Sequence, residues 1–272
     1  MKQIRMIALV MALLLLTLGV ARSETLMMAT TTSTDNTGLL DYLAPIFQAD
    51  TGIELKWTAL GTGKALKMGE DCNVDVLLVH APAAEKAFIE SGFGAERRQV
   101  MYNDFVIIGP GADAAKVRGM KVAEALKTIA GSGQKFISRG DDSGTNKKEI
   151  SLWKASGMEL PDKEAWYVQT GQGMLATIKV AEEMGGYTMT DRGTFITYAN
   201  DNKGNPPLVV LVEGDDVLFN QYSVLLLNKT HCPNVRHDLA EKFAAWMTSE
   251  KGQTIIGDFR LLDQTLFTPN AK

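Results

Sequence analysis

The segment MYNDFVIIGPG, residues 101–111, has a counterpart in LFNQYSVLLLN, residues 218–228, and these two stretches decide the fold. Both are long apolar runs of the kind that forms buried strands. Before, between and after them, short apolar runs alternate with segments of helical periodicity, which is typical of an α/β sheet with parallel neighbours. If the chain crosses between two lobes at the first segment and returns at the second, the result is a two-lobed α/β protein with a two-strand hinge.

These two crossing points divide the chain of 272 residues into parts. We expect a discontinuous lobe 1, made of residues 24–105 plus 222–272, and a lobe 2 made of residues 106–221. Within lobe 2 the stretch YTMTDRGTFITYAN, residues 187–200, is predicted to be a helix or a loop. A cleft between the lobes, at the carboxyl ends of the strands, is where folds of this kind bind their ligands.

The N-terminal residues 1–23, MKQIRMIALVMALLLLTLGVARS, predict a cleaved secretory signal peptide. Two basic residues precede an apolar run over residues 6–18, and Ala21 and Ser23 provide the small residues of a cleavage site. The apolar run is short for a membrane span, which needs about 20 residues. No cysteine lies near the cleavage point, so a lipoprotein anchor is not expected. We therefore expect a protein exported to a bacterial periplasm.

The charge balance argues against a nucleic-acid partner. Cleavage would remove three of the 28 basic residues and none of the 32 acidic ones, which leaves a formal charge of −7 (25 − 32). Nonspecific binding to nucleic acid requires a basic surface. A small anion is not excluded by this charge, because it responds to local dipoles and to a few nearby donors.

The two cysteines, Cys72 and Cys232, could form a disulfide in an oxidising compartment, but the sequence does not say whether they meet in space. His231 precedes Cys232 directly, which is a weak indication of a metal site. The chain has no CxxC or HExxH motif, so we interpret this pair as part of a surface loop and expect no metal.

Two segments share one design, in which an apolar strand leads through a hydroxyl-rich turn into a helix. They are MMATTTSTDNTGLL, residues 27–40, and FISRGDDSGTNKKE, residues 136–149. Such a helix start offers free backbone N–H groups and the positive end of the helix dipole. Capping by Ser33, Thr34 or Asp35 would explain one hydroxyl in the first segment. It does not require four in a row, so we expect an anion contact from Thr30, Thr31, Thr32 and Ser33.

The second segment adds a cation to the same design. Arg139 precedes the helix start, and its guanidinium offers fixed donors that match an oxyanion. Its alternative role is a salt bridge with Asp141 or Asp142. We expect both carboxylates to point away from the ligand and to orient Arg139 or cap the helix. The donors expected from the helix start itself are Ser143, Gly144 and Thr145.

Two glycine turns resemble nucleotide motifs but depart from them. GQGMLA, residues 171–176, fits GxGxxA with Asp191 at about the distance of a ribose partner, but the motif alone is weak. GTGKA, residues 61–65, lacks the first glycine and the Ser or Thr of a phosphate loop. Either turn can still serve a small anion, through the N–H of Gly173 or the hydroxyl of Thr62.

No hydrolase motif is present, since the chain lacks GxSxG and no histidine is an evident partner for Ser143. We therefore expect a binding protein without a cofactor rather than an enzyme. An exported enzyme that handles phosphoryl groups through Ser143 stays the rival class.

Taken together, these motifs resemble a known family, the periplasmic substrate-binding proteins of ABC transporters for oxyanions, and most closely its tungstate-binding group. The combination of TTTS with SRGDDSGT is fairly specific for that group. The matching pieces occur in order over most of the chain: ATTTST, DVLLVHAP, FISRGDDSGTNKKE, YTMTDRGTF and NQYSVLLLN.

The resemblance implies a type II periplasmic binding protein fold with the ligand cleft between its lobes. It implies binding of tungstate, and of molybdate as a second ligand, by a monomer that delivers the anion to an inner-membrane permease. A phosphate-binding protein is the alternative. Carried over to this chain, the motifs assign the ligand to Thr30, Thr31, Thr32 and Ser33 on one side and to Arg139, Ser143 and Thr145 on the other.

Overall fold

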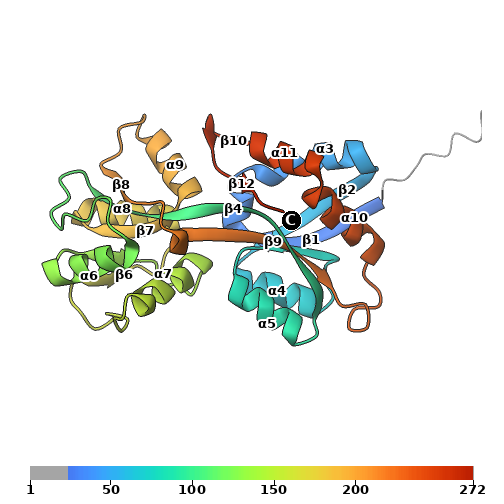
Figure 1. Ribbon diagram of the computed structural model, residues 1–272, viewed down its shortest axis with the longest axis horizontal. Helices are drawn as coiled ribbons and strands as arrows, with labels where there is room; N and C mark the ends of the chain where they lie inside the picture. Colours follow the sequence, from blue (N-terminus) through green and yellow to red (C-terminus); the bar gives the residue numbers. More distant parts are fainter. Residues whose placement is uncertain (1–23, 272) are drawn as a thin grey trace, which may run out of the picture.

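The structure is a computed structural model that describes residues 24–271 (Figure 1). The predicted signal peptide, residues 1–23, lies outside the described residues. The chain forms two lobes side by side, and two long strands run between them: β4 (Gly94–Pro110) and β9 (Phe219–Leu227). Within the described part of the chain, no helix has both the length and the apolar character needed to cross a bilayer.

The first lobe is a mixed sheet with helices on both faces. Its strand order is β2-β1-β3-β9-β4, in which β1, β2 and β3 are parallel and β9 runs antiparallel to its two neighbours. The remaining strands of this lobe are β1 (Glu24–Thr31), β2 (Ile53–Leu60) and β3 (Val76–Val79), with β12 (Thr268–Pro269) at the edge of β4. Its helices are α2 (Thr32–Asp35), α3 (Leu39–Thr51), α4 (Thr62–Glu70), α5 (Pro82–Glu90), α10 (His237–Thr248) and α11 (Glu250–Asp258).

The second lobe repeats this arrangement with the order β6-β5-β7-β4-β8, so that each lobe contains one antiparallel strand that arrives from the other. Its own strands are β5 (Phe136–Ser138), β6 (Tyr167–Gln169), β7 (Tyr187–Asp191) and β8 (Leu208–Val212). Its helices are α6 (Val122–Ser132), α7 (Gly144–Ala155), α8 (Met174–Met184), α9 (Arg192–Asp201) and the 3-10 turn η1 (Asp216–Leu218). A short hairpin of β10 (Arg260–Leu261) and β11 (Gln264–Thr265) follows α11.

Alternation along the strands explains the layers. In β1 the side chains of Leu26 and Met28 pack into the cluster under α3 and α10, whereas Ala29 belongs to the cluster under α4 and α5. Successive strand residues point to opposite faces, so a strand that is apolar on both faces must be covered by helices on both.

Residues a few positions apart along each of the two crossing segments belong to the apolar cores of different lobes. Met101 belongs to the core of the first lobe and Phe105 to that of the second, while Leu218 and Tyr222 show the same change on the return path. This grouping places the change between Met101 and Phe105 on β4 and between Leu218 and Tyr222 on the return path, close to the predicted division at residues 105/106 and 221/222, which stays a proposal.

The stretch predicted as helix or loop, residues 187–200, is instead a buried strand followed by a helix. β7 is a central strand, and its two threonines satisfy their hydroxyls on backbone carbonyls: Thr188 donates to Ile137 at 2.6 Å and Thr190 to Asp191 at 3.1 Å. Polar residues can therefore occupy a strand that the helices cover on both faces.

Candidate functional site

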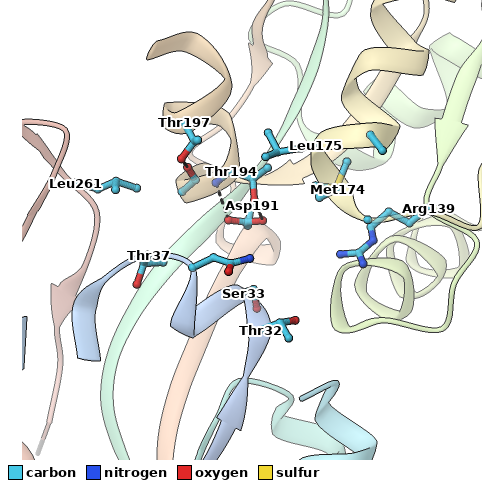
Figure 2. A pocket seen from close by; sticks show the side chains of 14 residues that line it. Thr32, Ser33, Thr37, Arg139, Met174, Leu175, Asp191, Thr194, Thr197 and Leu261 are labelled. Carbon is cyan, nitrogen blue, oxygen red and sulfur yellow. Dashed lines mark hydrogen bonds between the residues drawn. The ribbon is translucent and has the colours of Figure 1, made fainter. Parts of the chain in front are cut away.

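A cavity of about 520 Å³ lies between the lobes and is lined by residues of both (Figure 2). The parallel strands of each lobe end at this cleft, so the turns and helix starts that follow them supply its walls. The first lobe contributes Thr32, Ser33, Asn36, Thr37 and Leu261, and the second contributes Arg139, Gly173, Met174, Leu175, Ala176, Asp191, Gly193, Thr194 and Thr197.

The four hydroxyl residues after β1 have different surroundings. Thr32 and Ser33 line the cavity. Thr31 is the N-cap of α2, where its Oγ1 accepts a hydrogen bond from the Thr34 N–H at 3.3 Å. Thr30 is fully buried, and its hydroxyl donates to the Leu78 carbonyl at 2.8 Å, so its side chain belongs to the core and not to the cleft. We therefore leave Thr30 out of the proposed site.

His80, directly after β3, supports this turn and was not among the predicted site residues. Its Nε2 lies 2.8 Å from Thr31 Oγ1 and 3.0 Å from Ser33 Oγ. Burial lowers the pKa of His80, although a hydrogen bond to Asn220 and the charge of Asp191 oppose this effect, so the imidazole is neutral at pH 7. The sequence signal that could have revealed it is the position of a histidine at the carboxyl end of the buried strand VLLV.

Arg139 provides the cation on the opposite side. Its Nη2 donates to Asp141 Oδ2 at 2.6 Å, and Figure 2 shows the guanidinium directed toward Thr32 and Ser33. Its Nε is buried and has no hydrogen-bond partner within residues 24–271. A buried N–H without a partner is rare and costs free energy, so Arg139 lines the cavity with hydrogen-bonding capacity that the protein itself does not use.

The two aspartates beside Arg139 have separate roles. Burial raises the pKa of the Asp141 carboxyl, but hydrogen bonds from Ser143 and the charge of Arg139 outweigh it, so the pKa lies below its ordinary value. Asp141 is therefore a carboxylate that orients Arg139. Asp142 is exposed and lies 3.3 Å from the Lys147 ammonium. It does not cap α7, because the N-cap is Ser143, whose Oγ accepts from the Asn146 N–H.

The starts of α4 and α7 face each other across the cleft. A methyl group placed on Gly144 would lie 3.6 Å from Oγ1 of Thr62 and 3.8 Å from Cε1 of His80. These three residues line a second cavity of about 370 Å³ rather than the first. Thr145 is buried at the second position of α7, and the N–H groups of the first two residues of an α-helix have no partner within the helix.

The start of α8 is a wall of the larger cavity and lacks a side-chain cap. Its N-cap is Gly173, which brings no side chain, so the N–H groups of Met174, Leu175 and Ala176 have no capping acceptor. The start of α4 after Gly61 is uncapped in the same way. Both glycine turns that resemble nucleotide motifs therefore place free N–H groups and a positive helix end at the cleft.

One carboxylate lies on the wall of the larger cavity. Asp191 ends β7 and caps α9, where Thr194 donates to it from both the backbone N–H at 2.9 Å and the hydroxyl at 2.7 Å. The sequence had raised Asp191 only as a ribose partner. Here it is the one acidic group among the residues that line this cavity, whose other polar members are hydroxyl residues, Asn36 and the Arg139 guanidinium. Such a wall suits a small anion, whose burial without donors would be prohibitive.

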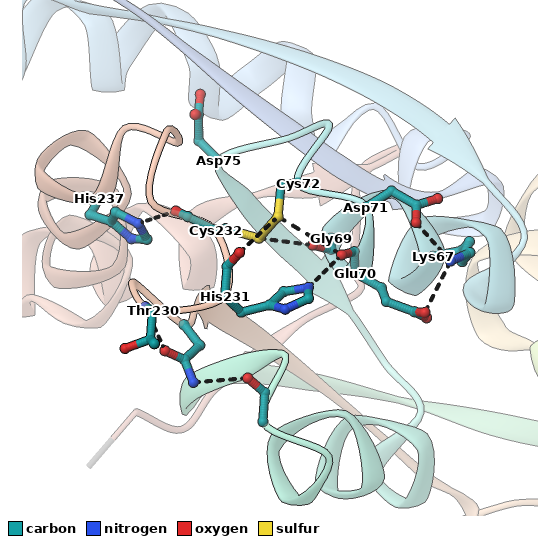
Figure 3. The surroundings of a disulfide bond; sticks show 12 residues. Lys67, Gly69, Glu70, Asp71, Cys72, Asp75, Thr230, His231, Cys232 and His237 are labelled. Carbon is teal, nitrogen blue, oxygen red and sulfur yellow. Dashed lines mark hydrogen bonds and ion pairs between the residues drawn. A yellow bond between two sulfur atoms is a disulfide. The ribbon is translucent and has the colours of Figure 1, made fainter.

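The cysteines lie at the other end of the first lobe. Cys72 and Cys232 form a disulfide with Cα atoms 5.4 Å apart, which settles the pairing that the sequence left open (Figure 3). Together with His231 they are the one group of potential metal ligands found in residues 24–271. The sulfurs are bonded to each other, and Nε2 of His231 lies 2.7 Å from the Glu70 carbonyl, which agrees with the interpretation as a structural loop.

The family model described as a PBP superfamily domain matches residues 19–251 of this chain. A curated relative, the tungstate-binding protein TupA of Campylobacter jejuni, is 55% identical over 240 residues, covering 88% of this chain and 89% of the relative. The chain belongs to the PBP superfamily, in the family of the TupA proteins. TupA of Peptoclostridium acidaminophilum, also named a tungstate-binding protein, is 47% identical over 251 residues, which cover 90% of this chain and 86% of that protein.

A solved TupA structure has the same fold. The tungstate-binding protein TupA from Desulfovibrio alaskensis G20 is 67% identical, with a TM-score of 0.88 over 92% of this chain and 100% of that one. A structure described as the tungstate ABC transporter from Geobacter sulfurreducens is 45% identical, with a TM-score of 0.76 over 87% and 99% of the two chains. The two-lobed α/β fold of the periplasmic binding proteins, predicted from the hinge segments, is therefore confirmed.

Proposed function

We propose that this chain binds tungstate, with molybdate as a second ligand, in the cleft between its lobes and delivers it to an ABC importer. The observation that carries the proposal is Arg139, whose side chain lines the cavity and whose buried Nε–H has no partner within residues 24–271. The names of the TupA relatives supply the identity of the anion.

The proposed ligand set combines one charge with many neutral donors. Arg139 provides the charge, and the uncapped starts of α4 and α8 provide N–H groups and helix dipoles. Hydroxyl and N–H groups of the turns after β1 and β5 complete the set. Its members are Thr31, Thr32, Ser33, Thr62, Arg139, Ser143, Gly144, Thr145 and Gly173.

Size and protonation set the selectivity of such a site. Sulfate has the same charge as tungstate but shorter bonds to oxygen, so it would reach fewer donors at hydrogen-bonding distance. Phosphate is the second candidate because it carries a proton near neutral pH, and Asp191 is an acceptor on the cavity wall. Tungstate carries no proton at that pH, so Asp191 would not accept a hydrogen bond from it and would keep only those from Thr194.

Binding in a cleft between two lobes favours the closed state, because each lobe offers only part of the donor set. The closed form would dock on the permease of the importer. We propose that the protein acts as a monomer in the periplasm after removal of its signal peptide, and that it catalyses no reaction.

Competition among anions tests the proposal. Thermal unfolding of the mature protein would be followed with tungstate, molybdate, phosphate and sulfate at equal concentrations, and we expect the largest shifts from the first two. A larger shift with phosphate would favour the phosphate-binding alternative. Turnover of a phosphoester that disappears in the Ser143→Ala variant would favour the rival class, an exported enzyme.

A further inference from the structure

A chain of hydrogen bonds runs from the ligand side of the first lobe into the hinge. It begins at the hydroxyls of Thr31 and Ser33, which lie 2.8 and 3.0 Å from Nε2 of His80. It continues from Nδ1 of His80 to Oδ1 of Asn220 at 2.9 Å, and from Nδ2 of Asn220 to Oδ1 of Asn103 at 2.8 Å. Capping of α2 explains the position of Thr31, but it does not explain why His80, Asn220 and Asn103 continue the hydrogen bonds into the hinge.

The direction of these bonds follows from the amides. Because Asn220 donates from Nδ2 to Asn103, its Oδ1 is an acceptor, and Nδ1 of His80 must carry the proton that it receives. In a neutral imidazole, Nε2 then has a lone pair and accepts. One hydroxyl of the pair Thr31 and Ser33 therefore donates to His80 and not into the cleft.

The far end of the relay lies between the two hinge strands. Asn103 of β4 and Asn220 of β9 are register partners, and both are buried. Nδ2 of Asn103 has no hydrogen-bond partner within residues 24–271, although it is buried. Its Oδ1 accepts from Asn220, so Asn103 keeps one amide donor in the hinge that the described residues do not use.

We propose that His80 is a positioning residue of the anion site, which orients the hydroxyls of Thr31 and Ser33 through Nε2 and ties them to the hinge amides through Nδ1. This inference rests on the proposed function. The hydrogen bonds of His80 thereby set how many hydroxyl donors the first lobe presents to the anion. The same histidine is bonded to Asn220 of the hinge strand β9, and through it to Asn103 of β4, so the number of donors is coupled to the position of the hinge.

The proton on the imidazole is coupled to the ligand. When His80 is protonated, Nε2–H donates to the hydroxyl oxygens, so the hydroxyl of Ser33, which lines the cavity, no longer has to donate to His80 and can donate into the cleft. A dianion nearby favours that form and opposes the lowering of the His80 pKa by burial, so binding takes up a proton, and affinity rises as the pH falls below neutral.

Other charged or titratable groups act on the same imidazole. The Tyr222 ring stacks on it at 4.6 Å, Asp191 of the second lobe favours the imidazolium, and Lys147 and Lys148 of α7 line the same smaller cavity and oppose it. Any proton uptake on binding must therefore be assigned by substitution of His80 itself.

Two substitutions separate the arms of the relay. In His80→Gln the terminal amide reaches the position of Nε2 and keeps a partner for the hydroxyls. In His80→Asn the shorter amide reaches the position of Nδ1 and keeps only the bond to Asn220. Calorimetric titration with tungstate at about pH 6, in two buffers of different ionisation enthalpy, measures affinity and proton uptake together. Thermal unfolding of each variant without tungstate confirms that it is folded.

We expect His80→Gln to bind within about threefold of the wild type and His80→Asn to bind roughly tenfold more weakly. Both should lose the proton uptake of the wild type. A third variant, Asn220→Asp, places a carboxylate against Nδ1 and should extend the tight binding to higher pH, because the unpartnered Asn103 amide can turn to donate to it.

Equal affinities of the Gln and Asn variants, or proton uptake that survives either substitution, would overturn the inference while tungstate binding by the wild type stands. A wild type that binds no tungstate would refute the proposed function and this inference with it.

Discussion

The guanidinium of Arg139 is held by Asp141 through a 2.6 Å hydrogen bond from Nη2, while its buried Nε–H has no partner in the described part of the chain. Asp141, two positions along the chain, therefore orients the cation and leaves one donor of the guanidinium unused. A buried donor without a partner costs about 1–3 kcal/mol. A shift of the side chain that brings this donor to a bound anion would recover the cost and add to the affinity.

The start of α8 provides a test of the backbone donors. Met174→Pro removes one N–H at the first helical position, where proline is tolerated because its fixed φ suits a helix start. Gly173 is extended with ψ 162°, which a following proline accepts. Since a hydrogen bond to a charged group contributes about 1.5–3 kcal/mol, we expect tungstate affinity to fall roughly 10- to 100-fold.

Met174→Ala is the matched control, because it removes the same side chain and keeps the N–H. Calorimetry should find its affinity within about threefold of the wild type. If both variants bind tungstate equally, the start of α8 does not contact the anion.

The contact between Gly144 and Thr62 tests closure of the lobes. Gly144→Ala adds a methyl group at ordinary contact distance, 3.6 Å from Oγ1 of Thr62, and should leave affinity nearly unchanged. Gly144→Leu adds a side chain that must displace the start of α4, so we expect affinity to fall by about tenfold or more with little change in the free energy of unfolding. Small-angle scattering with tungstate should show a compact wild type and a more extended Leu variant. Compaction equal to that of the wild type would contradict the closure argument.

The disulfide should stabilise the fold without affecting the site. Cys72 precedes β3 and lies at the end of the sheet opposite to His80, and the bond spans 160 residues of sequence. Removal of a disulfide that closes a loop of this size is expected to lower the free energy of unfolding by about 2–5 kcal/mol. Urea unfolding of the double variant Cys72→Ala with Cys232→Ala should show this loss, while its tungstate affinity at 25 °C stays that of the wild type. A large loss of affinity in the folded double variant would argue against this separation.

Glu149 of α7 predicts a pH dependence of stability. Burial raises the pKa of its carboxyl above the ordinary value of 4.5, although Ser138, Tyr167 and Trp153 donate hydrogen bonds to it. A folded-state pKa that is raised means that stability is fully present below the unfolded pKa and is lost as the pH rises through the folded one. Glu149→Gln mimics the protonated form, so it should remove this decline and unfold at pH 7 no earlier than the wild type. Urea unfolding from pH 4 to 7 compares the two proteins, and an unchanged slope would contradict the assignment.

The hinge and the alternation of elements could be predicted from the sequence because they depend on local patterns. Long apolar runs identified β4 and β9, and glycine turns identified the starts of α4 and α8. β7 was missed because its threonines made the segment look polar, and the partner of the Thr188 hydroxyl is the carbonyl of Ile137 on β5, which no local pattern reveals. Because β7 was not predicted, the position of Asp191 at its end, on the cavity wall, was not predicted either.

The motif TTTS alone does not predict which of its four side chains line the cavity, because this depends on the direction of each side chain. Side chains alternate along a strand, and Thr30 points into the core. Because β1 ends at Thr31, the residues after it, Thr32 and Ser33, are the ones that line the cavity. His80 lies 47 residues after Ser33 and becomes its neighbour only because β3 pairs with β1 in parallel. A contact of this kind depends on sheet order, which the sequence shows only after the whole topology is assigned.

The most direct test of tungstate capture by the cleft is a calorimetric titration of the mature wild type and of two Arg139 variants. We predict tight binding of one tungstate by the wild type and weaker binding by Arg139→Lys, which keeps the charge and loses the fork. Arg139→Glu should show no measurable binding, because it places a negative charge beside the dianion. Unchanged tungstate affinity in the Arg139→Glu variant would contradict the assignment of the site.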